Sequence, residues 1–149
     1  MKSILTNKAI KRSVLLIGLV SIFQPYIVLI TEYGRSNECW NCLIIEQTFM
    51  TSLVYLFLPL VAIYLLLKQL GANSFLIGLI VAVYFVPVSI VKITVPLFDD
   101  RIASWSTFSD QEVWDYAISM SIPSMGILAC FIVVSLGMMN KEPSMLNQK

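Results

Sequence analysis

The sequence predicts an all-α integral membrane protein, a four-helix transmembrane bundle with proline-kinked helices and both termini in the cytoplasm. Of the 149 residues, 58% are hydrophobic and only 13% are charged, whereas about 25% are charged in an ordinary soluble domain. Lys68 and Lys92 are the only charged residues between Phe49 and Phe98, a stretch long enough for two helices that each match the bilayer. We expect one membrane domain over residues 1–149.

The first predicted span covers residues 13–30, which follow a short basic start. A basic start and an apolar run are also typical of a secretory signal. No small-residue cleavage site follows the run, which continues into Thr31-Glu-Tyr-Gly, and the chain is expected to insert three more times. We therefore expect this helix to be retained.

Three further spans are predicted, at residues 49–67, 75–98 and 116–139. The second and third form a hairpin that turns at Lys68–Ser74 and breaks at Gly71. Helices joined by short loops pack as antiparallel neighbours. No internal repeat is evident.

A capping box marks the start of the fourth helix, at Ser109-Asp-Gln-Glu112. In such a box the Ser109 hydroxyl accepts from the third helical amide, while the Glu112 carboxylate reaches back to the Ser109 amide. The helix is therefore predicted to begin in the outer loop, before the hydrocarbon.

The lysines and arginines near the helix ends predict the orientation. One side of the predicted membrane receives seven of them and the other receives three. The acidic residues divide the opposite way, one against eight. Both termini and the hairpin turn are therefore placed in the cytoplasm. The loops at 31–48 and 99–115 are placed outside, where all three tryptophans lie, as in an interfacial aromatic belt.

Prolines fall within every predicted span. Each removes a helical hydrogen bond and clashes with the preceding turn, so we expect kinks that shape the packing. A hinge or a broken-helix binding site is the functional alternative. The prolines are Pro25, Pro59, Pro87, Pro96 and Pro123. Small residues four positions apart, Gly78 with Ala82 and Gly126 with Cys130, favour close helix contacts.

Gln24 and Lys92 are the polar side chains predicted to be most exposed to the membrane interior. An ionisable residue there is a functional candidate. Lys92 lies near the outer end of its span, so its stem can also snorkel to the interface or its ammonium can pair with Asp99 or Asp100. Gln24 can donate a hydrogen bond between helices.

Cys39-Trp-Asn-Cys42 is the clearest chemical motif. Such a pair on an exported loop is a redox pair, a metal half-site or a local disulfide. Zinc would lack ligands, because the only other cysteine is Cys130 and the chain has no histidine.

Four spans with this motif in the first outer loop resemble the bacterial disulfide-oxidising quinone reductases. Those proteins carry a second cysteine pair in the other outer loop and an arginine after the first pair. Here residues 99–115 contain no cysteine and residues 43–47 no arginine. A structural disulfide between Cys39 and Cys42 is therefore expected in an oxidising compartment, with thiol–disulfide exchange as the alternative.

Composition disfavours other classes of function. The absence of histidine removes the commonest general base and metal ligand. A net charge of +1 lacks the basic footprint of nucleic-acid binding. We therefore predict no catalytic residue, cofactor site or metal site, no enzyme activity and no nucleic-acid contact.

In its length, its uncleaved first helix and its hydropathy throughout, the chain resembles the small inner-membrane proteins by which conjugative plasmids exclude redundant DNA entry. The resemblance implies a non-enzymatic, multi-pass protein of the bacterial inner membrane that blocks transfer by contacting a component of the transfer machine. The first alternative is an immunity protein that meets the helices of a pore-forming bacteriocin in the bilayer. The second is an accessory subunit of a membrane complex. Expected partners are membrane lipid, such a membrane protein and a second copy of the chain.

The outer loop at 99–115 is the predicted contact surface. It combines five acidic residues with aromatic side chains, and aromatic residues dominate binding hot spots. Trp105, Phe108 and Trp114 are therefore expected to make the contact. The alternative is that these rings only anchor the helix at the membrane interface.

Overall fold

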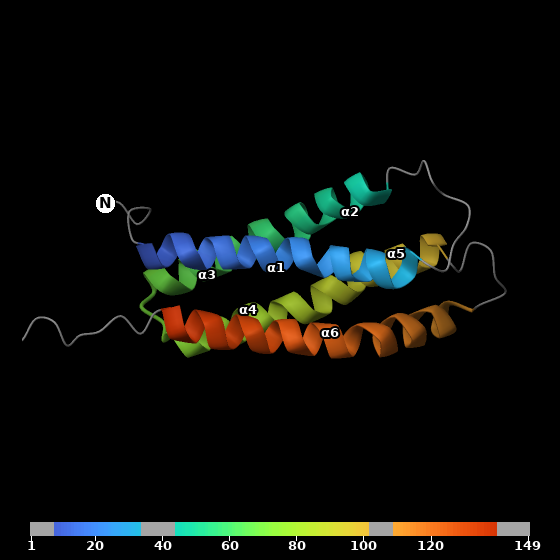
Figure 1. The fold of residues 1–149 in the computed structure, drawn as a ribbon. Coiled ribbons are helices and arrows are strands. Elements are labelled where there is room, and N and C mark those ends of the chain that lie inside the picture. The colour runs from blue at the N-terminus through green and yellow to red at the C-terminus, as the bar shows by residue number, and fades with distance from the viewer. Residues whose placement is uncertain (1–7, 34–43, 102–108, 140–149) are drawn as a thin grey trace, which may run out of the picture.

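The computed structural model consists of four long helical rods that run antiparallel to their chain neighbours (Figure 1). It describes residues 8–33, 44–101 and 109–139, with side chains at 8–28, 30, 48–98 and 109–138. No strand occurs among these residues. The segments long and apolar enough to cross a membrane are Lys8–Val28, Thr48–Gln69, Ser74–Phe98 and Asp110–Met138. The prediction of an all-helical chain with four membrane-length apolar helices is confirmed.

Each rod is helical from end to end, and the second and third rods each contain a π-helical segment. In a π-helix the amide donates five residues back instead of four. The elements in chain order are α1 (Lys8–Tyr33), α2 (Ile44–Ser52), η2 (Leu53–Phe57), α3 (Leu58–Gln69), α4 (Ser74–Ser89), η3 (Ile90–Thr94), α5 (Val95–Arg101) and α6 (Asp110–Met139). The four predicted spans lie inside these rods, and every rod extends beyond its span at one or both ends.

The turn between α3 and α4 lies where the sequence predicts it, at Lys68–Ser74. Gly71 adopts a φ of +73°, a left-handed conformation that glycine adopts without steric cost. Its amide and that of the next residue donate back to carbonyls of the last turn of α3, which is the Schellman pattern. Asn73 then caps α4, because its side-chain oxygen accepts from the Phe75 amide at 3.1 Å.

The capping box at the start of α6 forms only in part. The Ser109 amide donates to the Glu112 carboxylate at 2.8 Å, as predicted. The Ser109 hydroxyl, however, donates to the same carboxylate oxygen at 2.9 Å instead of accepting from a helical amide. That part of the prediction was wrong, because the charged carboxylate is the stronger acceptor and attracts both donors.

α4 and α6 approach each other closely at Gly78. A Cβ atom added to Gly78 would lie 3.0 Å from the Cα and 3.2 Å from the carbonyl oxygen of Val133, so the backbones touch there. Small residues permit such contact in membrane helices, where dispersion forces drive association. The contact expected at Gly126 and Cys130 is wrong, because a Cβ at Gly126 would meet nothing within 4 Å and Cys130 is exposed.

Buried apolar side chains from all four rods form one central cluster. Tyr64 and Phe85 are its largest fully buried members. A smaller cluster lies toward the start of α6, where the Phe98 and Tyr116 rings stack with centroids 4.4 Å apart. The rods are thus held together along most of their length.

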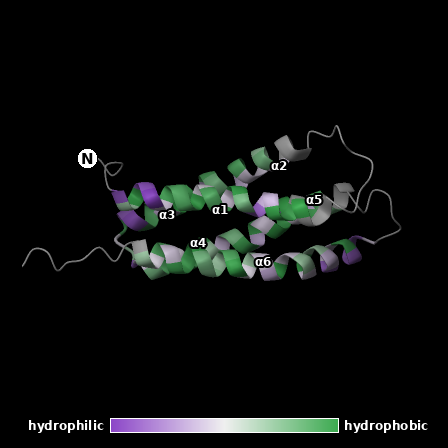
Figure 2. Ribbon diagram, in the orientation of Figure 1, coloured by the Kyte–Doolittle hydropathy of each residue, from purple (hydrophilic) through white to green (hydrophobic). Residues whose placement is uncertain are grey.

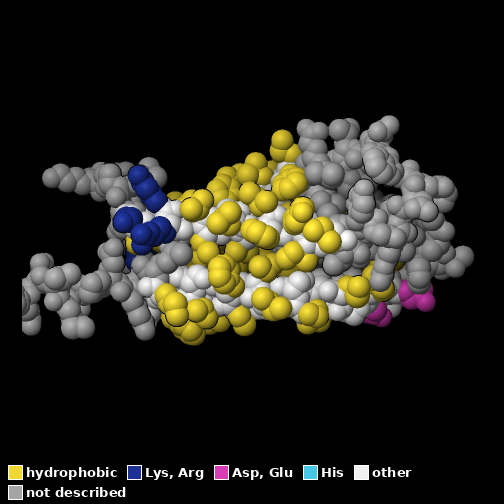
Figure 3. Space-filling model, in the orientation of Figure 1, with side chains coloured by type: hydrophobic (Ala, Val, Ile, Leu, Met, Phe, Trp, Pro, Cys, Tyr) yellow, Lys and Arg dark blue, Asp and Glu magenta, His cyan; other side chains and the backbone are white. Residues whose placement is uncertain are grey.

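Charge and hydropathy divide along the rods. Apolar residues cover their middle (Figure 2). Lysine and arginine gather where α1 begins, and acidic residues gather at the opposite end, where α6 begins (Figure 3). The start of α1, the turn between α3 and α4 and the end of α6 share the basic end (Figure 1). The orientation of this end toward the cytoplasm stays a prediction.

The prolines do not break the helices. α1, α4 and α6 continue through Pro25, Pro87 and Pro123. Pro59 and Pro96 instead lie at the start of the α-helix that follows each π segment. The kinks expected at these residues stay a prediction.

We predict that Gly78→Ala destabilises the bundle by about 1–2 kcal/mol relative to Gly126→Ala. Both changes add one methyl group and remove the same helix penalty of glycine, but only the first adds a methyl against a backbone that cannot move aside. Equilibrium unfolding in mixed detergent micelles measures the difference. Equal stability of the two variants would show that α4 and α6 do not approach closely at Gly78.

Candidate functional site

The second and third rods bring Tyr55, Tyr84 and Lys92 together within the membrane-length segments. The Lys92 Nζ lies 5.4 Å from the centroid of the Tyr55 ring, within the range of a cation–π interaction. The Tyr84 hydroxyl donates to the Tyr55 backbone carbonyl at 3.1 Å. Tyr55 and Lys92 are exposed, whereas Tyr84 is half-buried. We call these three residues the Lys92 site.

Pro59 explains why the Tyr55 carbonyl needs this hydroxyl. In an α-helix the amide of residue 59 would donate to the carbonyl of residue 55, but proline has no amide hydrogen. The backbone relaxes into η2, where the Leu58 amide donates to the Leu53 carbonyl. Because an unpaired backbone group costs several kcal/mol in hydrocarbon, Tyr84 supplies the missing donor from another rod.

Lys92 occupies in the third rod the position that Tyr55 occupies in the second. Ser52-Leu-Val-Tyr-Leu-Phe-Leu-Pro-Leu60 and Ser89-Ile-Val-Lys-Ile-Thr-Val-Pro-Leu97 share serine, valine, proline and leucine at matching places. In each copy the serine directly precedes the π segment, and the proline is the second residue of the next α-helix. Because the rods are antiparallel, the two copies are inverted. This short shared pattern was not identified from the sequence alone.

The depth of Lys92 makes its charge costly. Lys92 lies six residues before the end of its span at Phe98, and Tyr55 seven residues after the start of its span at Thr48. Both therefore lie roughly 10 Å inside the ends of the spans that are nearer the acidic end of the bundle. A lysine at the bilayer centre costs about 3 kcal/mol, a cost that decreases toward the interface. A cation–π contact offsets about 1–2 kcal/mol of it, so a further polar group at this site would be stabilising.

The sequence left two alternatives for Lys92, snorkelling to the interface and an ion pair with Asp99 or Asp100. Its ammonium lies against the Tyr55 ring, a contact that the sequence did not predict. The Asp99 and Asp100 side chains lie outside those that the structure describes, so the ion pair stays a prediction. Tyr55 and Tyr84 were missed as site residues. The available signal was the proline four residues after both Tyr55 and Lys92.

Buried polar side chains lie inside the bundle near the π segments. The Ser52 hydroxyl donates to the Ser21 carbonyl and joins α2 to α1. Gln24 is fully buried rather than turned toward lipid, and neither of its amide atoms has a hydrogen-bond partner among the described residues. Among the residues that the structure describes, the hydrogen bond expected from Gln24 between helices is therefore not made. The Ser89 hydroxyl is likewise buried without a partner there.

Of the residues predicted to form the disulfide or the partner contact, the structure describes only Trp114. This ring lies on the second turn of α6 and is 38% exposed. Cys39, Cys42, Trp105 and Phe108 lie outside the described residues, so the disulfide and the loop contact stay predictions. Within the described part of the chain, no group of three or more histidine, cysteine or acidic side chains is placed to hold a metal ion.

Comparisons of the chain with protein-family models, with curated proteins and with solved structures find no match. We therefore base the proposed mode of action on the geometry of the Lys92 site.

We predict that Tyr84→Phe lowers the free energy of unfolding by about 1 kcal/mol, the size of an interhelical hydrogen bond in a membrane. The loss should vanish in a Pro59→Ala background, because alanine restores the amide that the Tyr55 carbonyl lacks. A double-mutant cycle in mixed micelles measures this coupling. Tyr26→Phe, on the exposed face of α1, is the matched control and should change little. Additive effects of the Tyr84 and Pro59 changes would contradict this role of Tyr84.

Proposed function

We propose that this chain is a non-enzymatic, multi-pass protein of the bacterial inner membrane that acts by binding another membrane protein inside the bilayer. We propose further that this contact serves entry exclusion, in which a plasmid-bearing cell blocks redundant conjugative DNA transfer. The resemblance in size and hydropathy supports the biological process. The Lys92 site supports the mode of action.

The exposed cation is the observation that carries the proposal. Lysine is costly inside a membrane, and residues of this kind usually mark a functional contact. Here Lys92 stands on the outside of the bundle, with Tyr55 also exposed beside it. A partner helix that presents a carboxylate or an amide oxygen at this depth would satisfy the ammonium, and an aromatic residue beside it would add contact area. Neither lipid tails nor water supply that combination.

Trp114 supports a second part of the same contact. It lies at the acidic end of the bundle, and its ring is partly exposed on a helix start that the Ser109–Glu112 hydrogen bonds hold in place. Rigid aromatic side chains lose little conformational freedom on binding and are frequent in binding hot spots. A partner that contacts Lys92 in the outer part of the membrane would extend toward this end.

Immunity against a pore-forming bacteriocin is the second candidate function. The depth of the Lys92 site favours the immunity function. A pore-forming toxin presents its helices within the bilayer, where this site lies, and does not act on the aqueous loops. The two functions require the same kind of contact and differ in the partner.

A mating assay and a bacteriocin killing assay on the same strains test both candidates. Recipients that express the wild-type chain should reduce the transfer of a related plasmid. Lys92→Met keeps the length of the side chain but removes the charge, and should lower exclusion by about tenfold or more, which corresponds to the loss of about 1.4 kcal/mol of contact energy. Lys92→Arg should retain most of the activity. Trp114→Ala should give a smaller loss.

Protein levels in the membrane fraction and two control variants make the assay decisive. Ile127→Ala changes a side chain on α6 that is 71% exposed and should leave exclusion intact. Cys39→Ser with Cys42→Ser should also leave it intact, whereas complete loss at normal protein levels would favour thiol–disulfide exchange. Full exclusion by Lys92→Met would show that the contact does not involve Lys92. Protection from a bacteriocin without exclusion would assign the immunity function, and neither activity would favour an accessory subunit.

A further inference from the structure

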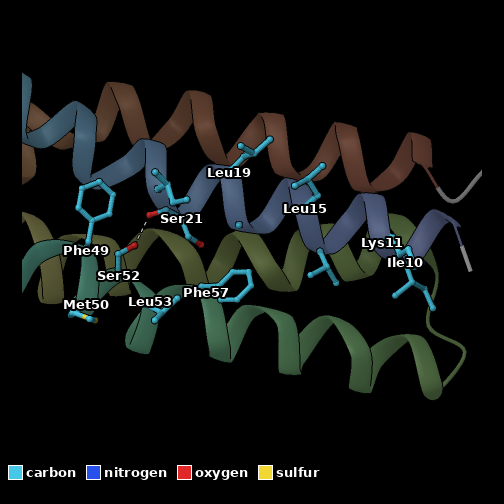
Figure 4. Close-up of a pocket in the computed structure, with 13 residues that line it drawn as sticks. Ile10, Lys11, Leu15, Leu19, Ser21, Phe49, Met50, Ser52, Leu53 and Phe57 are labelled. Atoms are coloured by element: carbon cyan, nitrogen blue, oxygen red, sulfur yellow. Dashed lines mark hydrogen bonds between the residues drawn. The ribbon is translucent and has the colours of Figure 1, made fainter. Parts of the chain in front are cut away.

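A groove of about 810 Å³ runs between α1 and the α2–η2 part of the second rod. Its size is within the range of sites that bind small molecules. Figure 4 shows Lys11 and Ile10 at one end of the groove and Phe49 and Met50 at the other. This groove is separate from the Lys92 site, none of whose residues lines it.

The two ends of the groove differ in chemistry. Lys11 is the only charged residue among the lining side chains, and it lies in the first turn of α1, at the basic end of the bundle. Lys8 precedes it by three positions and so lies on the same face of α1. Toward the other end, the Ser52 hydroxyl donates to the Ser21 carbonyl and joins the two walls (Figure 4). Between these ends the walls are apolar, with Leu15 and Leu19 exposed.

We infer that this groove binds one anionic phospholipid from the leaflet on the Lys11 side, with its phosphate at Lys11 and an acyl chain along the apolar walls. Basic pockets between transmembrane helices are known to take anionic headgroups. The inference is independent of the proposed function.

The length of the groove fits an acyl chain of one leaflet. On α1 the lining extends from Ile10 to Ile22, a rise of roughly 18 Å at 1.5 Å per residue. One leaflet contributes about 15 Å of hydrocarbon. The helix itself continues to Tyr33, so the groove ends well before the helix does. A partner helix crosses both leaflets and would require a groove along the whole of α1.

Gly18 lies opposite Phe57, which belongs to the other wall, at mid-length of the groove. A Cβ atom at this position would lie 3.2 Å from the Phe57 ring, so any side chain there would project into the space between the two walls. A large apolar residue at position 18 would fill the groove without adding charge or a polar group. Gly126 is the matched control, because a Cβ there meets nothing within 4 Å.

Native mass spectrometry of the full chain tests the inference. The protein is reconstituted in vesicles of phosphatidylethanolamine and phosphatidylglycerol, extracted in mild detergent and sprayed intact. We expect one retained phosphatidylglycerol per chain, in preference to phosphatidylethanolamine. Lys11→Gln should lower that preference about fivefold, the effect of one basic residue near an anionic headgroup. Gly18→Leu should abolish retention.

Matched variants separate a built site from general attraction to anionic lipid. Arg12→Gln removes one cation at the same end from a residue that does not line the groove, and should lower the preference less than Lys11→Gln does. Gly126→Leu should retain the lipid. Thermal unfolding of each variant confirms that the bundle is intact. Equal retention of both lipids by the wild type, equal loss in Arg12→Gln and Lys11→Gln, or lipid retained by Gly18→Leu would each overturn the inference. A dimer that replaces the lipid and is lost in Gly18→Leu would assign the groove to a second copy of the chain.

Discussion

In hydrocarbon every backbone carbonyl needs a donor from within the protein, and this requirement explains the middle of the bundle. Pro59 removes the donor that the Tyr55 carbonyl would have in an α-helix. The chain responds locally with the π segment η2 and at long range with the Tyr84 hydroxyl from α4. One proline thereby fixes how the second and third rods face each other, and it places the Tyr55 ring beside the Lys92 ammonium.

The α4–α6 contact, the groove and the Lys92 site are formed by different residues of the bundle. α4 and α6 pack against each other at Gly78, where their backbones touch. This contact needs no hydrogen bond between the two helices. The Ser52–Ser21 hydrogen bond joins α2 to α1, and the longer part of the groove extends from that contact toward the basic end. The Lys92 site lies on the second and third rods and shares η2 with the groove, but none of its three residues lines the groove. A contact with a partner protein and a bound lipid can therefore be perturbed by separate substitutions.

Hydropathy and Gly71 were enough to predict four membrane-length helices and the turn between α3 and α4, because apolar runs and a turn glycine act locally. The packing was predicted less well. Gly78 and Gly126 have the same four-residue spacing to a second small residue, yet only Gly78 faces another backbone, and spacing does not say which face of a helix is covered. The sequence did not identify Tyr55 and Tyr84 as site residues. Their roles depend on a carbonyl that a proline leaves without an amide donor, and on the position of a neighbouring rod. The orientation of the bundle in the membrane stays a prediction from charge counts.

Site-specific photo-crosslinking in living cells tests the central claim, that the surface around Lys92 contacts another membrane protein. A photoreactive amino acid at Val91, an exposed neighbour of Lys92, is compared with one at Ile127 under conditions in which the wild type is active. We expect a single adduct with one membrane protein, identified by its peptides, at position 91 and its loss when Lys92→Met is added. Adducts with lipid alone at both positions, in cells where exclusion or immunity is intact, would contradict the claim.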